Sequence, residues 1–305
     1  MLMIHSPVLL AEVINLMNIE PSGHYIDATF GRGGHSKAIL EKLGPRGSVT
    51  AFDRDPEAVA IAHKLSRVDS RLRVMHSQFS KMGESSDLVA GNIDGVLFDL
   101  GLSSPQVDDS ARGFSFRFDG PLDMRMNPDD AVSAKDWLNS ASEKDISDVL
   151  WKYGEERASR KIAKVIVKER KAKPITSTSA LAKIVRSCFR FNRSKIDPAT
   201  RSFQAIRIHI NSELFEIEAG LENALSLLKQ GGRLLIISFH SLEDRIVKHR
   251  FRDLDLISRD GLRDNSLEAP SYQVIKPKLL RASEQEKSTN PRSRSARLRA
   301  IERFA

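Results

Sequence analysis

Two features of this chain have residue types and a spacing suited to a chemical role: a glycine-rich turn and a carboxylate that follows it. Residues 25–35 read as a buried strand and then a turn that holds Gly31, Gly33 and Gly34. Glycine permits positive φ and close approach of a ligand, and the helix start behind the turn presents free N–H groups. Asp53 ends the next expected strand, 22 residues after Gly31. A carboxylate there commonly binds the hydroxyls of a ribose, so the spacing indicates a nucleoside-containing cofactor.

The turn matches neither of two common phosphate-binding patterns. The sixth residue counted from Gly31 is Ser36 rather than glycine, so the dinucleotide fingerprint is incomplete. No Gly-Lys-Ser or Gly-Lys-Thr follows, which excludes a phosphate loop. A cofactor without a phosphate fits better, and S-adenosylmethionine is the common one. The alternative is that these glycines serve only tight packing.

Other polar segments follow expected strands and should meet the glycine turn at one edge of a parallel sheet. Phe79 comes after the third strand, where we expect it to stack on or flank an adenine. Residues 99–106 follow the fourth strand and begin with Asp99. Each has a plainer explanation, because Phe79 is equally suited to a core and Asp99 to capping a turn.

The fourth segment bears on the type of reaction. Methyl transfer to an exocyclic amine requires acceptors that draw the nitrogen toward tetrahedral geometry. We expect Asp99 and the backbone of Ser103, Ser104 and Pro105 to supply them. Methylation at carbon 5 of a pyrimidine would need a cysteine nucleophile. The single cysteine, Cys188, lies far in sequence from every expected strand end, and we expect it to be a buried apolar residue.

Strands and helices alternate in the first third of the chain, which predicts a parallel α/β sheet. The expected strands cover residues 25–28, 48–52, 72–76, 95–98 and 233–238. An irregular loop is expected at 110–125 and helices from 134 to 228, so the sheet is interrupted by a helical insertion. Residues 228–233 read as a helix end with glycines. We expect the basic tail from about residue 272 to be partly extended or to become ordered only on contact with RNA.

Composition narrows the class of protein. The chain has 305 residues, is 40% hydrophobic and contains one cysteine, which excludes an internal disulfide and argues against a cysteine-ligated zinc site. It lacks an apolar run of about 18 residues and a secretory signal pattern. We therefore expect a cytoplasmic protein with no membrane partner and no metal. The sequence does not reveal an oligomeric state.

Basic residues are concentrated in the middle of the chain. Residues 110–210 contain 21 Lys and Arg against 12 Asp and Glu, whereas the remainder contains 27 against 28. A localised basic region favours a polyanion such as RNA, although a solvated helical face is the plainer explanation. The candidate phosphate contacts are Lys161, Lys164, Lys168, Arg170, Arg186, Arg190 and Arg193. Binding through them should weaken steeply with salt.

Nine segments along the chain carry a specific resemblance. They are residues 5–10, 27–36 (Asp-Ala-Thr-Phe-Gly-Arg-Gly-Gly-His-Ser), 52–55, 99–106 (Asp-Leu-Gly-Leu-Ser-Ser-Pro-Gln), 113–116, 121–126, 197–207, 237–245 and 290–299. Together they resemble the bacterial ribosomal RNA small-subunit methyltransferase H family, also called the MraW family. The departures are small: Asp197 stands where asparagine is common, and Ser202 where threonine is common.

The resemblance implies a fold, a reaction and a set of site residues. It implies a class I, Rossmann-like α/β methyltransferase with an inserted helical domain, which transfers a methyl group from S-adenosylmethionine to N4 of one cytidine in 16S rRNA, in the decoding region of the small ribosomal subunit. The family's cofactor contacts fall on Gly33, Gly34, His35, Asp53, Phe79, Asp99 and Gln106. We expect residues 1–109 with 211–305 to bind the cofactor, and the inserted residues 110–210 to recognise RNA together with the tail.

His240 and Ser241 follow the fifth expected strand, and we expect them to shape the pocket of a flipped-out base. Capping of the next helix is the alternative for both. Two other functions remain open from the residues alone. One is a nicotinamide-dependent oxidoreductase, which also uses a glycine turn and an acidic strand end. The other is a non-catalytic RNA-binding assembly factor with the same fold.

Overall fold

The computed structural model describes residues 7–189, 196–264 and 271–304. The chain divides into two compact units. Unit 1 comprises residues 1–101 and 215–305, and unit 2 comprises residues 102–214. The inserted unit therefore starts eight residues earlier and ends four residues later than the boundaries expected from the sequence.

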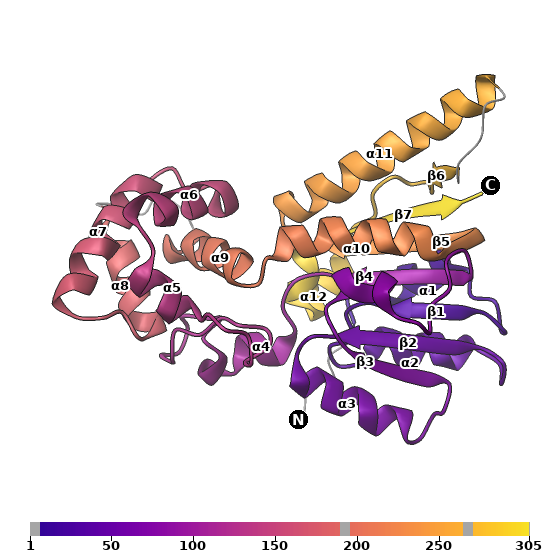
Figure 1. The fold of residues 1–305 in the computed structure, drawn as a ribbon, viewed down its shortest axis with the longest axis horizontal. Coiled ribbons are helices and arrows are strands. Elements are labelled where there is room, and N and C mark those ends of the chain that lie inside the picture. Colours follow the sequence, from indigo (N-terminus) through magenta and orange to yellow (C-terminus); the bar gives the residue numbers. More distant parts are fainter. Residues whose placement is uncertain (1–6, 190–195, 265–270, 305) are drawn as a thin grey trace. The chain divides into compact units, whose positions relative to one another are not determined.

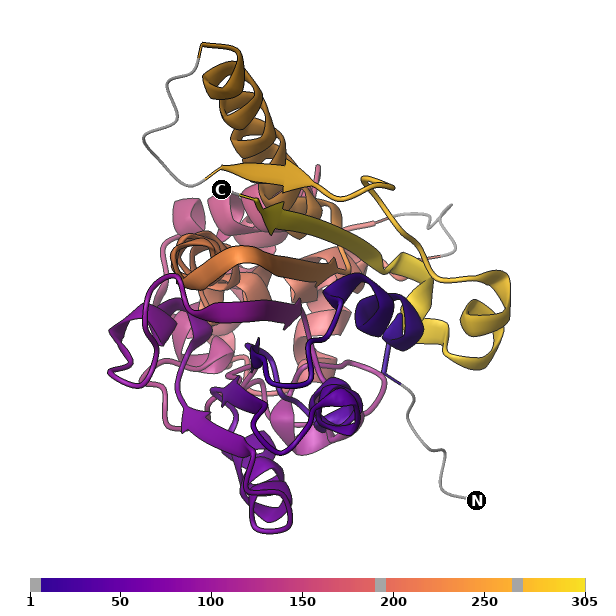
Figure 2. The ribbon, with the colours of Figure 1, turned by 90° about the vertical axis from the view of Figure 1, so that its right-hand side faces the viewer.

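Unit 1 is built on a seven-stranded sheet with the order β3-β2-β1-β4-β5-β7-β6 (Figure 2). Its strands are β1 (His24–Asp27), β2 (Ser48–Asp53), β3 (Leu72–His76), β4 (Ile93–Asp99), β5 (Leu228–Ser238), β6 (Tyr272–Val274) and β7 (Arg297–Arg303). Strands β1 to β5 are parallel, and β7 runs antiparallel to both of its neighbours. This arrangement confirms the α/β class.

Helices cover both faces of the sheet, because successive strand residues are apolar on both sides. On one face, Leu97 and Leu235 pack with Val13 of α1 (Leu10–Met17) and Ile39 of α2 (Gly34–Lys42). The adjacent Phe98 points to the other face. The remaining helices and short turns of unit 1 are α3 (Pro56–Ser66), η1 (Phe79–Glu84), α10 (Glu213–Leu227), α11 (Ser241–Asp264), α12 (Glu284–Thr289) and η3 (Pro291–Ser295) (Figure 1).

Two expectations about the second half of the sheet were wrong. Residues 228–232 begin β5 instead of ending a helix: Leu228 pairs with Ile93, and Gly231, with φ +79°, lies in an irregularity of the ladder. The tail is not an extended arm, because its last strand, β7, is hydrogen-bonded between β5 and β6. The buried Leu298 and Ala300 fix β7 in the core.

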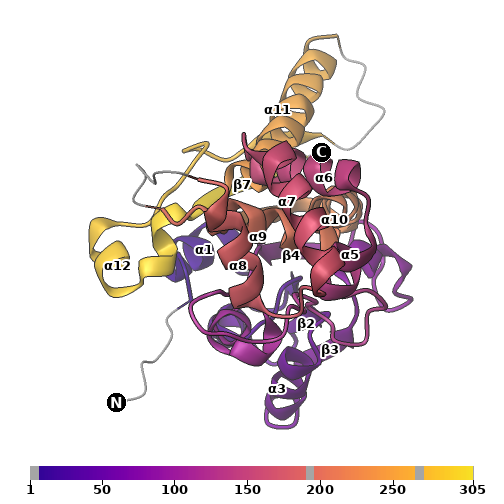
Figure 3. The same cartoon turned by 90° about the vertical axis from the view of Figure 1, so that its left-hand side faces the viewer.

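Unit 2 is helical, as the insertion was predicted to be (Figure 3). It contains α4 (Ser104–Asp108), η2 (Ser110–Arg112), α5 (Ala134–Ser140), α6 (Glu143–Gly154), α7 (Ser159–Ala172), α8 (Thr178–Ser187) and α9 (Ala199–Ile210). Its own core includes Leu138, Ile162 and Leu181. Cys188 belongs to this core, which confirms the expected buried residue, and burial raises the pKa of its thiol.

Across the described ranges, the structure holds no helix both long and apolar enough to span a membrane.

Candidate functional site

The topology of unit 1 defines a binding edge. The strand order reverses between β1 and β4, and ligands of open parallel sheets bind beyond the carboxyl ends of the strands at such a point. Asp27 ends β1 and Asp99 ends β4. The two strands pair directly, with Asp27 opposite Leu97. Two carboxylates therefore lie at the switch point of the sheet.

The glycine turn between β1 and α2 lies at this edge. Gly31 and Gly33 have φ of +54° and +73°, and Gly33 is the N-cap of α2. A Cβ atom at Gly33 would lie 2.5 Å from the Phe30 ring, and one at Gly34 would lie 2.3 Å from Cγ of Pro7. At Gly31 the nearest atom would be 3.9 Å away. Gly33 and Gly34 thus serve close packing, and Gly31 provides the open backbone.

Asp53 connects the end of β2 to the glycine turn. One of its carboxylate oxygens accepts a hydrogen bond from Gly31 N at 2.8 Å, and the other accepts one from Asp55 N at 2.9 Å. Burial raises the pKa of Asp53 to about 6, against the lowering effect of these two backbone donors. Asp53 therefore fixes the turn. Each oxygen retains acceptor capacity for a ligand hydroxyl.

Asp99 is the carboxylate at this edge with an unpaired oxygen. Its backbone N–H donates to Thr29 Oγ1 at 2.6 Å, which holds β4 against the turn. Oδ1 is enclosed and has no hydrogen-bond partner in the described part of the chain, although 30% of the side chain is exposed. Burial, reinforced by the charges of Asp27 and Glu243, raises the pKa of Asp99 to about 8.

His35 faces Asp99 from the first turn of α2. Its Nε2 lies 3.9 Å from Asp99 Oδ2, and neither ring nitrogen has a hydrogen-bond partner among the residues the structure describes. Burial lowers the pKa of His35, so the ring is neutral at pH 7. A neutral imidazole does not offset the charge of an ionised Asp99, whereas a cationic ligand would.

Phe79 lies after β3, at the same edge. Its half-buried ring meets Phe98 edge-on with ring centres 5.1 Å apart. Gly220 of α10 provides the space for the ring, since a Cβ there would lie 2.5 Å from it. Phe79 is therefore packed from behind, and its partial exposure leaves part of the ring available to a flat ligand.

The end of β5 is organised by Glu243, a buried residue of α11. One of its carboxylate oxygens accepts hydrogen bonds from the backbone of Phe239 at 2.7 Å and of His240 at 3.2 Å. In return, Glu243 N donates to His240 Nδ1 at 3.4 Å. This reciprocal arrangement is that of a capping box, so His240 caps α11 and Ser241 is the exposed first residue of that helix. The capping alternative thus has direct structural support.

Residues 103–106 belong to unit 2 and do not form the expected loop of free carbonyls. The chain enters helix α4 at Ser104. The carbonyl of Pro105 accepts from Asp109 N at 2.8 Å, and that of Ser103 accepts from Val107 N at 3.4 Å. Gln106 is buried, and its side chain accepts from Ser103 N at 3.0 Å. The backbone of this segment is therefore largely used by its own helix.

The candidate RNA contacts of unit 2 differ in what they already bind. Arg170 donates to the carbonyls of Leu138 and Ala141, and Arg186 pairs with Asp197 at 2.8 Å. Lys161 donates to the carbonyl of Cys188. Lys164 and Lys168 are exposed on α7. Arg190 and Arg193 lie outside the described residues.

Several site residues were not singled out from the sequence. Ser36 donates to the buried Asp27 at 2.6 Å, and Thr29 binds the backbone of Asp99. Both belong to the conspicuous segment 27–36, but nothing in their type distinguished them from ordinary turn residues. Glu243 had a readable signal, because a glutamate three residues after a helix start is typical of a capping box.

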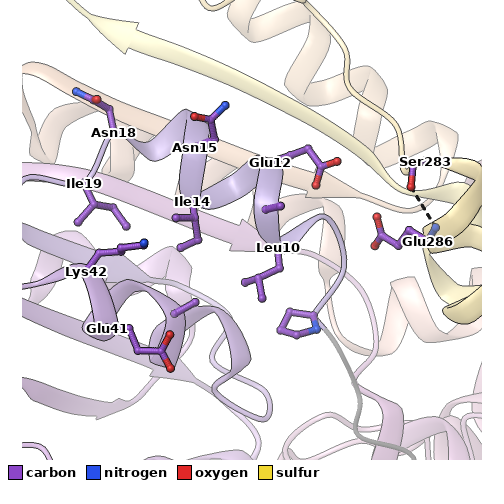
Figure 4. Close-up of a pocket in the computed structure, with 13 residues that line it drawn as sticks. Leu10, Glu12, Ile14, Asn15, Asn18, Ile19, Glu41, Lys42, Ser283 and Glu286 are labelled. Carbon is purple, nitrogen blue, oxygen red and sulfur yellow. Dashed lines mark hydrogen bonds between the residues drawn. The ribbon is translucent and has the colours of Figure 1, made fainter.

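A groove of about 880 Å³ lies elsewhere in unit 1, between α1, α2 and α12. Leu10, Ile14 and Ile19 line its apolar part and Glu12, Glu41 and Lys42 its polar part (Figure 4). None of the predicted site residues lines it. The groove is therefore separate from the candidate site.

Known proteins resemble this chain along almost its whole length. The profile of the MraW methylase family matches residues 2–304. A ribosomal RNA small subunit methyltransferase H from Chromobacterium violaceum is 50% identical, over 99% of this chain and 96% of that protein. One from Alcanivorax borkumensis is also 50% identical, over 99% and 97%. A solved SAM-dependent O-methyltransferase from Thermotoga maritima aligns with 99% of this chain and 68% of its own, at 9% identity and a TM-score of 0.43.

Proposed function

This chain belongs to the MraW methylase family, and on that premise we propose that it transfers a methyl group from S-adenosylmethionine to the exocyclic N4 of a cytidine in 16S rRNA of the small ribosomal subunit. The observation that carries the proposal is the Asp99 carboxylate at the switch point, with Oδ1 enclosed and without a partner among the described residues. A buried acid of this kind costs stability, so a binding or catalytic role explains its presence better than packing does.

The residues at this edge fit a cationic adenosyl cofactor. When bound, S-adenosylmethionine supplies an electrophilic methyl group on a positively charged sulfur. Asp99 and Asp27 would offset that charge, Asp53 would accept the ribose hydroxyls, and Phe79 would contact the adenine. We propose the full contact set as Gly33, Gly34, His35, Asp53, Phe79, Asp99 and Gln106. The packing of Gly33 and Gly34 makes an indirect role the natural one for both, through the shape of the turn.

The acceptor amine needs little more than orientation. The lone pair of N4 is delocalised into the cytosine ring, so an acceptor that holds an amine hydrogen draws the nitrogen toward tetrahedral geometry. Asp99 is our candidate for this acceptor, since the carbonyls of Ser103 and Pro105 are already engaged in α4. The role first assigned to the backbone of Ser103, Ser104 and Pro105 is thereby reduced to placing α4.

We assign RNA binding to the inserted unit, through cations that have no internal partner. Lys164 and Lys168 meet this condition among the described residues, whereas Arg170 and Arg186 are held by α5 and Asp197. Contacts with phosphates supply affinity without sequence information. His240 and Ser241 remain candidates for the wall of the base pocket, with His240 held in place by Glu243.

Single-turnover transfer of a labelled methyl group tests the function. The acceptor is small ribosomal subunits from cells that lack this gene, and subunits from cells that carry it are the control, because their target is already methylated. Label should enter only the former, on N4 of one cytidine identified by mass spectrometry. Label on another atom, or none with either naked RNA or subunits, would contradict the proposal. Equilibrium dialysis with S-adenosylmethionine and with a nicotinamide cofactor shows which of the two the protein binds, and so distinguishes a methyltransferase from the oxidoreductase alternative.

A further inference from the structure

The C-terminal segment of unit 1 differs in charge from the rest of that unit. Residues 271–305 contain nine Lys and Arg and only three Asp and Glu. The other residues of unit 1 contain 18 Lys and Arg against 22 Asp and Glu. A basic segment on an otherwise acidic unit is a local electrostatic feature and does not follow from overall composition.

The sheet register places this segment at the binding edge. Arg297, the first residue of β7, pairs with Ser238, the last residue of β5. Arg294 lies three residues earlier, in η3, and so beyond that edge. Leu280 pairs with Leu298, which brings Arg281 to the same end of the sheet. The segment that precedes β7 therefore borders the carboxyl ends of the parallel strands, near α12 in Figure 1.

Some cations of the segment are used internally. Arg299 pairs with Asp244 at 2.7 Å, Lys287 pairs with Glu284 at 2.7 Å, and Arg303 donates to the carbonyl of Leu228. Five others make no ion pair with the described part of the chain: Lys276, Lys278, Arg281, Arg294 and Arg297. The first four are exposed and Arg297 is half-buried. Most of this charge therefore has no carboxylate partner within ion-pair distance among the described residues.

The distance from these cations to the reacting edge follows from the strand pairing. Asp99 of β4 pairs with Ile237 of β5, which in turn pairs with Leu298 of β7. Two strand spacings amount to about 10 Å, so the start of β7 lies roughly that far from Asp99 along the sheet edge. A nucleotide whose base reaches Asp99 must be out of its stack, which leaves its neighbouring phosphates outside the base pocket.

We propose that Lys276, Lys278, Arg281, Arg294 and Arg297 form a phosphate-binding surface on unit 1 for the RNA strand that flanks the target base. The proposal rests on the function proposed above and locates part of the RNA grip on the cofactor-binding unit itself. Exposed Lys and Arg bind phosphates without reading bases, so the surface positions the strand and adds no sequence preference. Arg297 is held in place by the sheet, because β7 is hydrogen-bonded on both sides.

The test reverses two of these charges. The double variant Arg281→Glu/Arg294→Glu is compared with Arg46→Glu/Arg67→Glu, in which two exposed arginines before β2 and after α3 receive the same change at the opposite edge of the sheet. Affinity is measured for unmethylated small ribosomal subunits over a range of salt concentrations. Cofactor affinity by calorimetry and the melting temperature show whether each variant is folded.

We expect the first variant to bind subunits at least about tenfold more weakly, with a log-log salt slope shallower by about 1.4, which corresponds to two single-strand phosphate contacts. Its cofactor affinity and melting temperature should match those of the wild type. The affinities of the control for subunits and for the cofactor should stay within about twofold of the wild type, with an unchanged melting temperature. A first variant that binds like the wild type would overturn the surface, as would an equal loss in the control. In either case, methyl transfer by the wild-type protein would leave the proposed function standing.

Discussion

Charged side chains of the inserted unit and those at the binding edge of unit 1 differ in whether they have partners within the protein. In unit 2, Arg170 donates to two backbone carbonyls, Arg186 pairs with Asp197, and Arg207 pairs with the buried Glu213 at 2.7 Å. At the edge of unit 1, Asp99 has an enclosed oxygen with no partner and His35 has two such nitrogens among the described residues. These arginines of unit 2 are thus partnered, whereas Asp99 and His35 at the edge of unit 1 each keep a polar atom without a hydrogen bond among the described residues.

This difference separates structural charges from functional ones. A partnered side chain contributes to stability, and replacing it strongly destabilises the protein because its partner is left unpaired. An unpartnered buried group lowers stability, and its place in the molecule calls for a ligand or a reaction. Counting basic residues along the sequence finds a basic region but cannot tell these two groups apart. Replacing one member of each group should therefore give opposite results for stability and activity.

The largest effect is expected from Asp99→Asn. The amide has nearly the shape of the carboxylate but no charge, so it offsets neither a cationic cofactor nor the developing charge on the amine. We expect the single-turnover rate to fall by about 10²–10³, a typical loss for one electrostatic contact in an active site. The melting temperature should stay the same or rise, because the change removes a buried carboxyl group whose ionised form is unfavourable.

A fall in both activity and stability would contradict this assignment, because it would mean that Asp99 is part of the framework. Thr29→Val offers the matched control, since its hydroxyl accepts the Asp99 backbone N–H and has no expected contact with the substrate. That variant should lose stability, about 1 kcal/mol for one hydrogen bond, before it loses chemistry.

Arg170→Ala should show the reverse behaviour. The guanidinium donates at 2.5 and 2.7 Å to the carbonyls of Leu138 and Ala141 near the end of α5. Hydrogen bonds to a charged group are worth about 1.5–3 kcal/mol each, so we expect a loss of about 3 kcal/mol in the free energy of unfolding measured with urea. Lys168→Ala, on the same helix but exposed, should change it by less than about 0.5 kcal/mol. Equal losses would show that Arg170 is not structural.

The pH dependence of cofactor binding sharpens the contrast further. Burial and the charges of Asp27 and Glu243 raise the pKa of Asp99 to about 8, so the free protein holds a proton there at neutral pH. A cationic ligand favours the ionised acid, and its binding should therefore release a proton. Affinity for S-adenosylmethionine should rise by up to about tenfold per pH unit from pH 6.5 to 8 and then level off.

Two controls separate Asp99 from its neighbours. His35 is already neutral in this range, and Asp53, with a pKa of about 6, is mostly ionised above pH 7. The neutral product S-adenosylhomocysteine should show a weaker dependence, and Asp99→Asn should show almost none. A slope that persists in that variant would assign the proton to another group.

The contribution of Asp99 to folding stability changes with pH in the opposite direction to its contribution to cofactor affinity. A carboxyl whose pKa is raised in the folded state stabilises that state most at low pH, below its ordinary pKa. This contribution is lost as the pH rises from about 4 to about 8. The cofactor binds only the folded state and therefore stabilises it. Its rising affinity over the upper part of that pH range would compensate for the loss of stability.

Strong local patterns made much of unit 1 predictable. The strands that carry Asp27, Asp53 and Asp99 are largely apolar runs that end in a carboxylate, and each ends within one residue of the expected position. The tail was not predictable in this way, because β7 alternates Arg297, Leu298, Arg299 and Ala300 and looks polar by composition. Its place in the sheet depends on pairing with β5, which is remote in sequence.

The roles of individual charged residues were also beyond the sequence. Nothing local distinguishes Arg170, which reaches back to α5, from Lys164 in the same helix, which is exposed. The packing of Gly33 against Phe30 and of Gly34 against Pro7 depends likewise on where the chain returns. Composition predicted that a basic region exists, whereas only the hydrogen bonds show which of its members are free.

The smallest effect is expected from Lys164→Ala/Lys168→Ala, and it tests the free members of the basic region directly. Both side chains are exposed on α7 and make no ion pair in the described ranges. If each contacts one phosphate, the log-log salt slope for subunit binding should become shallower by about 0.7 per residue, with stability unchanged. Lys144→Ala is the matched control, because Lys144 is also exposed but already pairs with Asp148 at 2.5 Å. A control that loses as much affinity per charge as the double variant would break the distinction between partnered and unpartnered cations, and the inserted unit would then bind RNA through its net charge alone.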